Sequence, residues 1–167
     1  IFADSQGFIW ISTYGGGAVR YDGYTFSKPV SSSTEVASNS CKGFAEDGHH
    51  RLWVAYDEVT VVVDMRTMHN VTPTLHPQPS TLHHQSSTLR LQRPSVKVYC
   101  DAKGHLWHVT SDSIFRYTFA EDGSVSHISS CRYRGNTPDV TIADIERNGT
   151  VWININNGLF RLSEHGS

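Results

Sequence analysis

The sequence predicts an all-β fold, a partial β-propeller made of four blade-like units that are each a four-stranded antiparallel sheet. The first observation behind this prediction is that all four Trp residues stand in one frame, six residues after an acidic residue and directly after an aliphatic one. The second is their spacing of 43, 54 and 45 residues, which is close to the ~40–50 residues of a propeller blade. The four are Trp10, Trp53, Trp107 and Trp152.

Each unit opens with a tight turn between its first two strands. An acid at the first position and Gly at the fourth is the type I preference, because a carboxylate caps backbone N–H groups and Gly adopts the left-handed conformation at little cost. The structural frame consists of Asp4, Gly7 and Trp10, then Asp47 and Trp53, then Asp101, Gly104 and Trp107, and finally Glu146, Gly149 and Trp152. We expect each Trp to pack between neighbouring units.

The second unit departs from this frame at one position. His50 stands where the other three units have Gly. Either Gly48 takes over the turn, or the second unit bears a backbone strain of roughly 1 kcal/mol.

Two further strands follow each Trp. Apolar and β-branched runs predict the third strands at residues 19–22, 59–64, 114–117 and 158–162, and the fourth strands at 24–26, 68–72 and 125–128. The predicted blades span residues 1–40, 41–95, 96–139 and 140–167. Unit one has only Ile1 to Ala3 for its first strand, and unit four stops after Leu162 without its fourth. Such a partial ring leaves unpaired edges and exposed faces.

Residues 73–94 differ in composition from the rest of the chain. They contain four Pro together with Ser, Thr, His and Gln, and they lack the apolar alternation of a strand. Pro cannot donate a hydrogen bond to a sheet. We expect a Pro/Ser/His-rich surface insertion, either a long excursion or a disordered segment, with a lid or partner contact as the functional alternative.

The bulk composition limits the partners of the chain. Its formal charge is −2 and its pI is near 6.6, so there is no electrostatic case for binding nucleic acid. No apolar run in the sequence approaches the ~18 residues that span a bilayer. The chain opens at Ile1 without an initiator Met or a signal peptide, and we expect it to be part of a longer protein.

No catalytic residue, metal site or cofactor is predicted. The pairs His49-His50 and His83-His84 would diverge on a strand and lack carboxylate or Cys partners at metal-site spacing. No Ser/His/Asp grouping can be argued from the spacing. The three Cys residues are interpreted as buried free thiols, with a disulfide between Cys100 and Cys131 as the alternative.

Three residues are candidates for binding a ligand. Propellers bind ligands at loops on one face, near the central channel. Tyr14, Tyr56 and Asn156 stand just after the Trp segments, at positions that vary while the frame repeats. Ordinary loop variation would give the same pattern, but aromatic and amide groups suit sugars, through stacking on ring faces and hydrogen bonds to hydroxyl groups. The hypothesis is therefore a carbohydrate ligand.

The chain resembles the two-component regulator propeller repeat. The sharpest match is Asp4-Ser5-Gln6-Gly7-Phe8-Ile9-Trp10-Ile11-Ser12-Thr13, followed by Gly15-Gly16-Gly17 and Arg20-Tyr21-Asp22-Gly23. The resemblance reaches Leu162 and is loosest in the second unit. It implies a fragment of a seven-bladed propeller from the periplasmic sensor region of a hybrid two-component system, the ectodomain of an inner-membrane histidine kinase in glycan-degrading gut bacteria. The implied partners are the rest of the propeller and the parent sensor chain, or a second copy in a homodimer.

Three functions remain open at this stage. The leading one, from the resemblance, is ligand sensing without catalysis by this fragment. The second is an enzyme that resembles the streptogramin lyases, which are also propellers; it needs a His base and a carboxylate at the channel, and His108 is the candidate base. The third is an interaction scaffold that binds no small ligand.

Overall fold

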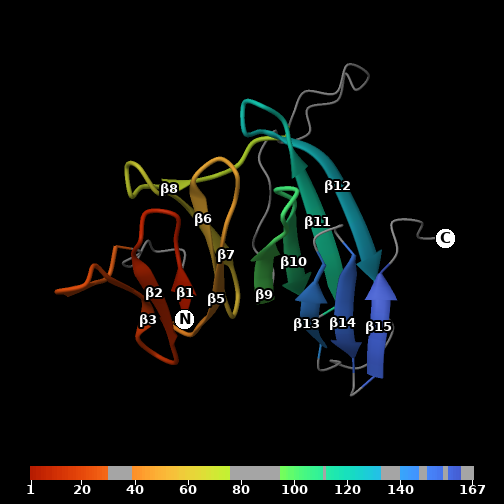
Figure 1. Cartoon of the computed structure of the whole chain (residues 1–167), viewed down its shortest axis with the longest axis horizontal. Helices are drawn as coiled ribbons and strands as arrows, with labels where there is room; N and C mark the ends of the chain where they lie inside the picture. The colour runs from red at the N-terminus through yellow and green to blue at the C-terminus, as the bar shows by residue number, and fades with distance from the viewer. Residues whose placement is uncertain are drawn as a thin grey trace.

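The prediction of an all-β fold with four antiparallel units is confirmed. The computed structural model describes residues 1–29, 39–75, 95–110, 112–132, 140–146, 150–155 and 158–162. Every regular element in these ranges is a β-strand, and the strands form four antiparallel sheets that follow one another in chain order (Figure 1). None of the described residues forms a helix that is long and apolar enough to cross a membrane.

Within each sheet, strands that are neighbours in the sequence are neighbours in space. The first sheet contains β1 (Phe2–Ala3), β2 (Ile9–Thr13), β3 (Gly17–Tyr21) and β4 (Phe26–Ser27). The second contains β5 (Cys41–Glu46), β6 (Arg51–Tyr56), β7 (Thr60–Asp64) and β8 (Asn70–Val71). The third contains β9 (Ser95–Cys100), β10 (Leu106–Thr110), β11 (Ser113–Phe119) and β12 (Val125–Arg132). The fourth contains β13 (Val140–Ile145), β14 (Val151–Ile155) and β15 (Gly158–Leu162).

The sheets follow the predicted units closely. The fourth sheet has three strands within the described residues, in line with the expectation that unit four lacks its fourth strand, so the four-stranded description holds for the first three sheets. The third sheet begins at Ser95 and its last strand continues to Arg132, four residues past the predicted end. Of the predicted insertion, residues 73–75 are described: the backbone N–H of Val125 donates to the carbonyl oxygen of Thr74 at 2.8 Å, and the remaining residues, 76–94, lie outside the described residues.

Each unit is closed by a hydrogen bond that joins the two ends of its sequence frame. The indole Nε1–H of the Trp donates to the carboxylate of the acid six residues before it, at 2.7 Å for Trp10 and Asp4 and again at 2.7 Å for Trp53 and Asp47. The same bond measures 3.0 Å in the third unit, from Trp107 to Asp101, and 2.6 Å in the fourth, from Trp152 to Glu146.

The first carboxylate also holds the turn that precedes its Trp. One oxygen of Asp4 accepts the backbone N–H groups of Gln6 at 3.0 Å and Phe8 at 2.9 Å, while the other accepts the indole of Trp10. Sequence reasoning assigned the acid to the turn and the Trp to packing. It missed that one side chain performs the capping and orients the other.

The turn of the second unit is built on His50 itself. Its φ is 57°, in the left-handed region, where Gly7 and Gly104 have φ values of 90° and 78°. Of the two alternatives, Gly48 therefore does not take over the turn, and His50 bears the conformational cost of a side chain in this region. Gly149, the corresponding residue of the fourth unit, lies outside the described residues.

The repeat Trp side chains lie between sheets. Trp10 is fully buried in a cluster with β-branched residues of the second sheet, and its ring centroid is 5.7 Å from that of Phe44. Trp53 is fully buried in a second cluster, with its ring centroid 6.0 Å from that of Tyr117 in the third sheet. The face of the first sheet that carries Trp10 and both faces of the second sheet are thus apolar, because each packs against a neighbouring sheet.

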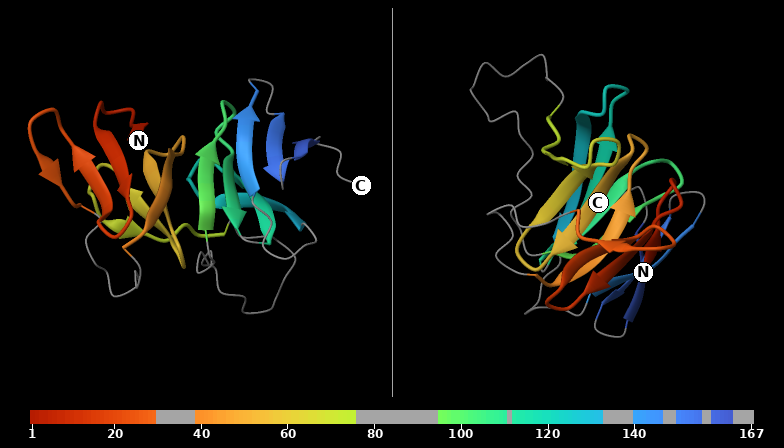
Figure 2. Two further views of the ribbon diagram at one scale, coloured as in Figure 1. Left: turned by 90° about the horizontal axis from the view of Figure 1, so that it is seen from below. Right: turned by 90° about the vertical axis from the view of Figure 1, so that its left-hand side faces the viewer.

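The first strands of consecutive sheets converge. β1 contacts β5, β5 contacts β9, and β9 contacts β13. Seen from below, the four sheets follow one another across the molecule (Figure 2). This convergence places residues that are about fifty positions apart in the sequence next to one another, and it forms the candidate site described below.

The Trp packing predicts a large stability loss on truncation. Trp53→Ala should lower the free energy of unfolding by roughly 3–5 kcal/mol, because removing the indole leaves a cavity between two packed sheets. Trp53→Phe should cost about 1–3 kcal/mol, since it leaves a buried carboxylate oxygen of Asp47 without its indole donor. Denaturant unfolding measures both, and Tyr24→Ala, at a side chain that is 92% exposed, is the control. A loss below about 1 kcal/mol for Trp53→Ala would contradict the packing role.

The turn geometry predicts opposite effects at two equivalent positions. His50→Gly should stabilise the protein by up to about 1 kcal/mol, because it removes the strain of a side chain at φ 57°. Gly104→Ala should destabilise it by a similar ~1 kcal/mol; a Cβ there would meet nothing within 4 Å, so only backbone strain is introduced. Thermal unfolding of the two variants side by side checks this, and a destabilised His50→Gly protein would refute it.

Candidate functional site

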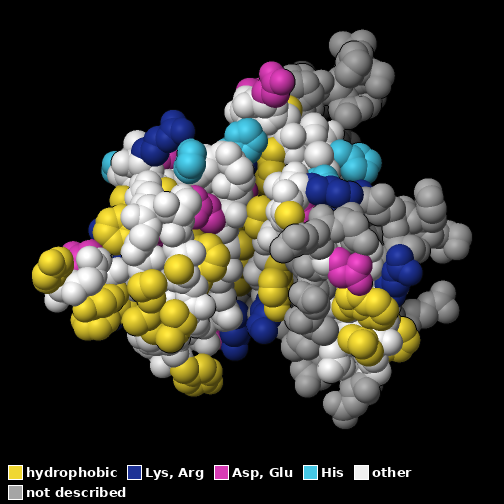
Figure 3. All heavy atoms as spheres, in the orientation of Figure 1, with side chains coloured by type: hydrophobic (Ala, Val, Ile, Leu, Met, Phe, Trp, Pro, Cys, Tyr) yellow, Lys and Arg dark blue, Asp and Glu magenta, His cyan; other side chains and the backbone are white. Residues whose placement is uncertain are grey.

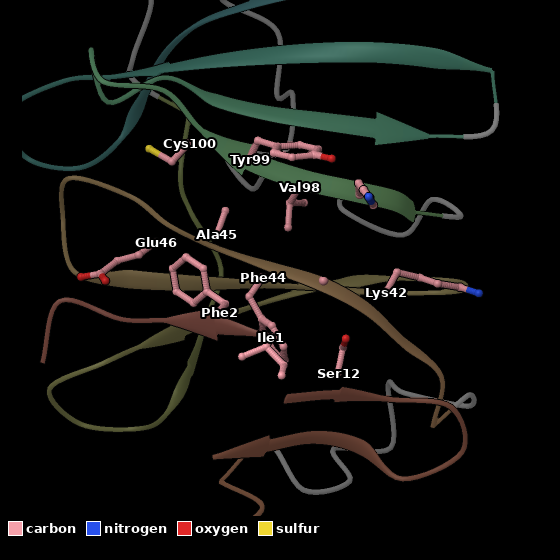
Figure 4. Close-up of a pocket in the computed structure, with 12 residues that line it drawn as sticks. Ile1, Phe2, Ser12, Lys42, Phe44, Ala45, Glu46, Val98, Tyr99 and Cys100 are labelled. Atoms are coloured by element: carbon pink, nitrogen blue, oxygen red, sulfur yellow. The ribbon is translucent and has the colours of Figure 1, made fainter. Parts of the chain in front are cut away.

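A hollow of about 460 Å³ lies where the first three sheets meet. It is bordered mainly by the first strands of these sheets, β1, β5 and β9, with a contribution from β2 (Figure 4). The lining consists of Ile1, Phe2, Ser12, residues 42–46 and residues 97–100. The lining combines apolar side chains such as Phe2 and Phe44 with two Lys and one Glu, and small-molecule sites are usually concave and hold a few polar groups that orient the ligand.

The walls of the hollow are apolar in the middle and charged at the ends. Phe2 and Phe44 contribute facing rings with centroids 6.4 Å apart. Lys42 and Glu46 stand near opposite ends of β5 and extend in opposite directions along the hollow (Figure 4). The hollow is therefore polarised, with a cationic end and an acidic end.

Two lysines from neighbouring sheets define the cationic end. Lys42 on β5 and Lys97 on β9 both line the hollow. The Nζ of Lys42 is 2.8 Å from Oδ1 of Asp57, and both side chains of this pair are more than a third exposed. An exposed ion pair of this kind contributes only about 0–1 kcal/mol, so Lys42 can exchange Asp57 for an anionic group of a ligand.

Aromatic rings stand beside both lysines. The Nζ of Lys42 is 5.9 Å from the ring centroid of Tyr14, and the Nζ of Lys97 is 5.9 Å from that of Tyr99. Tyr14 is 93% exposed in the turn between β2 and β3. An exposed ring next to an ammonium group offers a stacking surface and a charge to the same ligand.

At the acidic end, Glu46 has a structural role. Its Oε2 accepts the backbone N–H of Ser5 at 2.7 Å, its Oε1 accepts the hydroxyl of Ser5, and Nδ1 of His50 is 3.6 Å from the same Oε1. These bonds tie the turn of the first sheet to the first strand of the second. Glu46 is consequently part of the contact between the sheets.

Of the three predicted ligand-binding residues, the structure describes Tyr14 and Tyr56, and it places them in different environments. Tyr14 reaches the cationic end of the hollow, whereas Tyr56 is 2% exposed inside the first core cluster, where burial raises the pKa of its hydroxyl to about 12. Asn156 lies outside the described residues. The residue that occupies the place of Tyr14 in the second unit is Asp57, four positions after its Trp, and both contact Lys42.

Sequence reasoning missed the lysines of the hollow. It examined the loops after each Trp, while Lys42 and Lys97 lie on the first strands, before the acids of the second and third units. The sequence did contain a signal for them. A Lys in an otherwise apolar strand is expected either to reach solvent or to bind an anionic group, because an unpaired Lys is almost never fully buried.

His108 lies inside the packing between the second and third sheets. It is fully buried, its Nε2 is 3.2 Å from Oγ1 of Thr60, and its Nδ1 is 3.5 Å from Oη of Tyr117. Among the described residues that line the hollow there is no His. Nor do the described residues contain a group of three or more His, Cys, Asp or Glu that could hold a metal ion.

The cysteine at the hollow is a protonated thiol. Burial, together with the nearby carboxylates of Asp101, Asp47 and Glu46, raises the pKa of Cys100 to about 12. Burial likewise raises the pKa of Cys41 to about 11. All three cysteines are free in the structure, so it agrees with free thiols and does not contain the alternative disulfide. The prediction that the thiols are buried is right for Cys41 and wrong for Cys131, which is exposed, while Cys100 is partly buried.

These thiols should differ in reactivity in a pH-dependent way. At pH 8 a thiol reagent should label Cys131 first, because it is exposed, while Cys41 and Cys100 react only after unfolding. The ordinary pKa of a cysteine thiol is 9.0. As the pH rises above this value the folded protein should lose stability, because Cys41 and Cys100 can ionise in the unfolded chain before they can ionise in the folded one. Mass spectrometry after pulse labelling with and without denaturant checks the order; rapid labelling of Cys100 in the folded protein would contradict it.

Comparison with known proteins gives matches at the level of structure. No protein-family profile and no curated protein matches the chain. Two solved structures of the extracellular domain of BT4673 from B. thetaiotaomicron match at TM-scores of 0.65 and 0.63, with 19% and 18% sequence identity. BT4673 is designated a one-component system in one case and a hybrid two-component system in the other.

A third match comes from the same organism. The extracellular domain of the hybrid two-component system designated BT3049 has a TM-score of 0.56 and 17% identity. These matches cover 97% or 98% of this chain but only 21–28% of the matched chains, so the chain spans about a quarter of the domains it resembles. At such identities the likeness establishes a shared fold: this chain folds like part of the extracellular domains of BT4673 and BT3049 from B. thetaiotaomicron.

Proposed function

We propose that this chain is part of the periplasmic ligand-sensing region of a hybrid two-component sensor kinase, and that its four sheets are blades of a seven-bladed β-propeller. The observation that carries the proposal is the structural likeness to the extracellular domains of BT4673, which extends over 97% of the chain. In this role the chain binds and does not catalyse. The signal would be read by the kinase part of the parent sensor chain.

The meeting of the first strands supports the propeller arrangement. In a propeller the first strand of every blade lines the central channel. Here β1, β5, β9 and β13 contact one another in chain order, and the first three of these strands line the hollow. The hollow would then be a sector of the channel wall, and the remaining blades would supply the rest of it.

We further propose that the ligand is a glycan or its breakdown product and that it binds at the cationic end of the hollow. Tyr14 supplies a ring for stacking on a sugar face. Lys42 and Lys97 supply donors for sugar hydroxyls and favour a sugar with a carboxylate, such as a uronic acid. Tyr56 pairs across the sheet with Cys41, the residue before Lys42, and Asn156 is retained as a third candidate contact.

Calorimetry with neutral and uronic-acid oligosaccharides tests this function. The full ectodomain should bind a member of the panel, and the isolated chain should bind it at least tenfold more weakly, because a channel site draws contacts from several blades and each 1.4 kcal/mol is about a factor of ten in affinity. Lys97→Ala in the ectodomain should weaken binding, whereas Lys103→Ala, on the exposed turn between β9 and β10, is the matched control.

Three results would change the proposal. Equally tight binding by the isolated chain would place the whole site within these four sheets. If Lys97→Ala leaves the affinity for the oligosaccharide unchanged, the hollow is not the binding site. Turnover of any sugar would replace sensing by a lyase-like activity, and failure of the full ectodomain to bind any panel member would overturn the glycan assignment.

A further inference from the structure

Lys42 is held by an acidic side chain of its own sheet. Its Nζ is 2.8 Å from Oδ1 of Asp57, which lies in the turn between β6 and β7. Strand pairing brings the two together, because Cys41 and Tyr56, the residues directly before them, are partners across β5 and β6. Lys42 lines the hollow and Asp57 does not, so the carboxylate reaches Lys42 from beside the hollow.

The first sheet places an uncharged side chain beside the same ammonium group. Tyr14 stands four positions after Trp10, as Asp57 does after Trp53, and its ring centroid is 5.9 Å from Nζ of Lys42. The two equivalent turns therefore flank Lys42 with a ring and a carboxylate. A ring can share an ammonium group with an anionic ligand, whereas a carboxylate repels the ligand's own carboxylate.

Solvent can reach both members of the Lys42 pair. Their side chains are 36% and 40% exposed, and Figure 3 shows Lys or Arg side chains at the lower edge of the molecule, near β5 and β9. A buried ion pair of the same sheet, Arg51 with Asp47, differs: its side chains are 10% and 0% exposed, and Arg51 also donates to the carbonyl oxygen of Gly123. A ligand can therefore replace Asp57 at Lys42, whereas the Arg51 pair is fixed.

We propose that Asp57 occupies Lys42 in the place of the anionic group of an acidic sugar, and that such a sugar must displace it. The ammonium group has three donors, so a neutral hydroxyl can bind Lys42 beside Asp57. A carboxylate that binds Lys42 lies next to Asp57 and is repelled by it. Asp57 therefore lowers the affinity of the site for acidic sugars selectively. This inference rests on the proposed function, because it concerns the same site.

Calorimetry of the full ectodomain with trigalacturonic acid and with the matching neutral trimer of galactose tests this inference. Asp57→Asn should tighten binding of the acidic trimer about two- to fivefold, the range that an exposed ion pair can contribute. It should leave the affinity for the neutral trimer unchanged. The matched control, Glu58→Gln, removes the same charge at the neighbouring, exposed residue of this turn and should change neither affinity. Both variants should keep the melting temperature of the parent.

Three results would overturn the inference. One is an Asp57→Asn ectodomain that binds the acidic trimer no more tightly than the parent does. Another is a gain of equal size for the neutral trimer or in Glu58→Gln, because Asp57 would then act as a general surface charge. The third is a parent ectodomain that does not bind the acidic trimer. The glycan assignment is judged separately, since it fails only if the ectodomain binds no sugar of the wider panel.

Discussion

The hydrogen bond between each repeat Trp and the acid six residues before it is the interaction on which the rest of this structure depends. It fixes the indole plane relative to the turn, and the same carboxylate caps the backbone of that turn in the first unit. Because the bond recurs in all four units, every sheet holds its Trp side chain at the equivalent position, next to the turn that contains the acid. A charged acceptor and a buried donor make this bond stronger than a neutral one.

With the indoles fixed, the packing between sheets follows. The face of a sheet that carries the Trp requires an apolar surface opposite it. Leu52 and Val54 of the second sheet supply that surface for Trp10, and Leu106 and Tyr117 of the third sheet supply it for Trp53. The sheets then converge at their first strands, where side chains have less room. The hollow is the space left between β1, β5 and β9, so the candidate site is a consequence of how the repeats stack and is not built by any single unit.

Because the units repeat, the residues that pack the sheets together are different from the residues that line the ends of the hollow. The packing residues on the faces of the sheets repeat from unit to unit, and two of them, Trp10 and Trp53, are fully buried. The ends of the hollow carry residues that differ from unit to unit, such as Lys42, Lys97 and Tyr14. Residues at the ends of the hollow can therefore vary without altering the packing between the sheets.

The sequence alone determined what is local. The turn chemistry of Asp4 and Gly7 and the apolar runs around each Trp specify strands and hairpins, because these depend on neighbours within a few residues. The fate of Tyr14 and Tyr56 was decided only by the tertiary structure. Tyr56 is the last residue of β6 and is covered by Trp10 and Ala18 of the first sheet, whereas Tyr14 lies beyond the end of β2 in an exposed turn. Lys42 and Lys97 likewise line the same hollow only because β5 and β9 lie side by side, a contact between distant segments that no local pattern encodes.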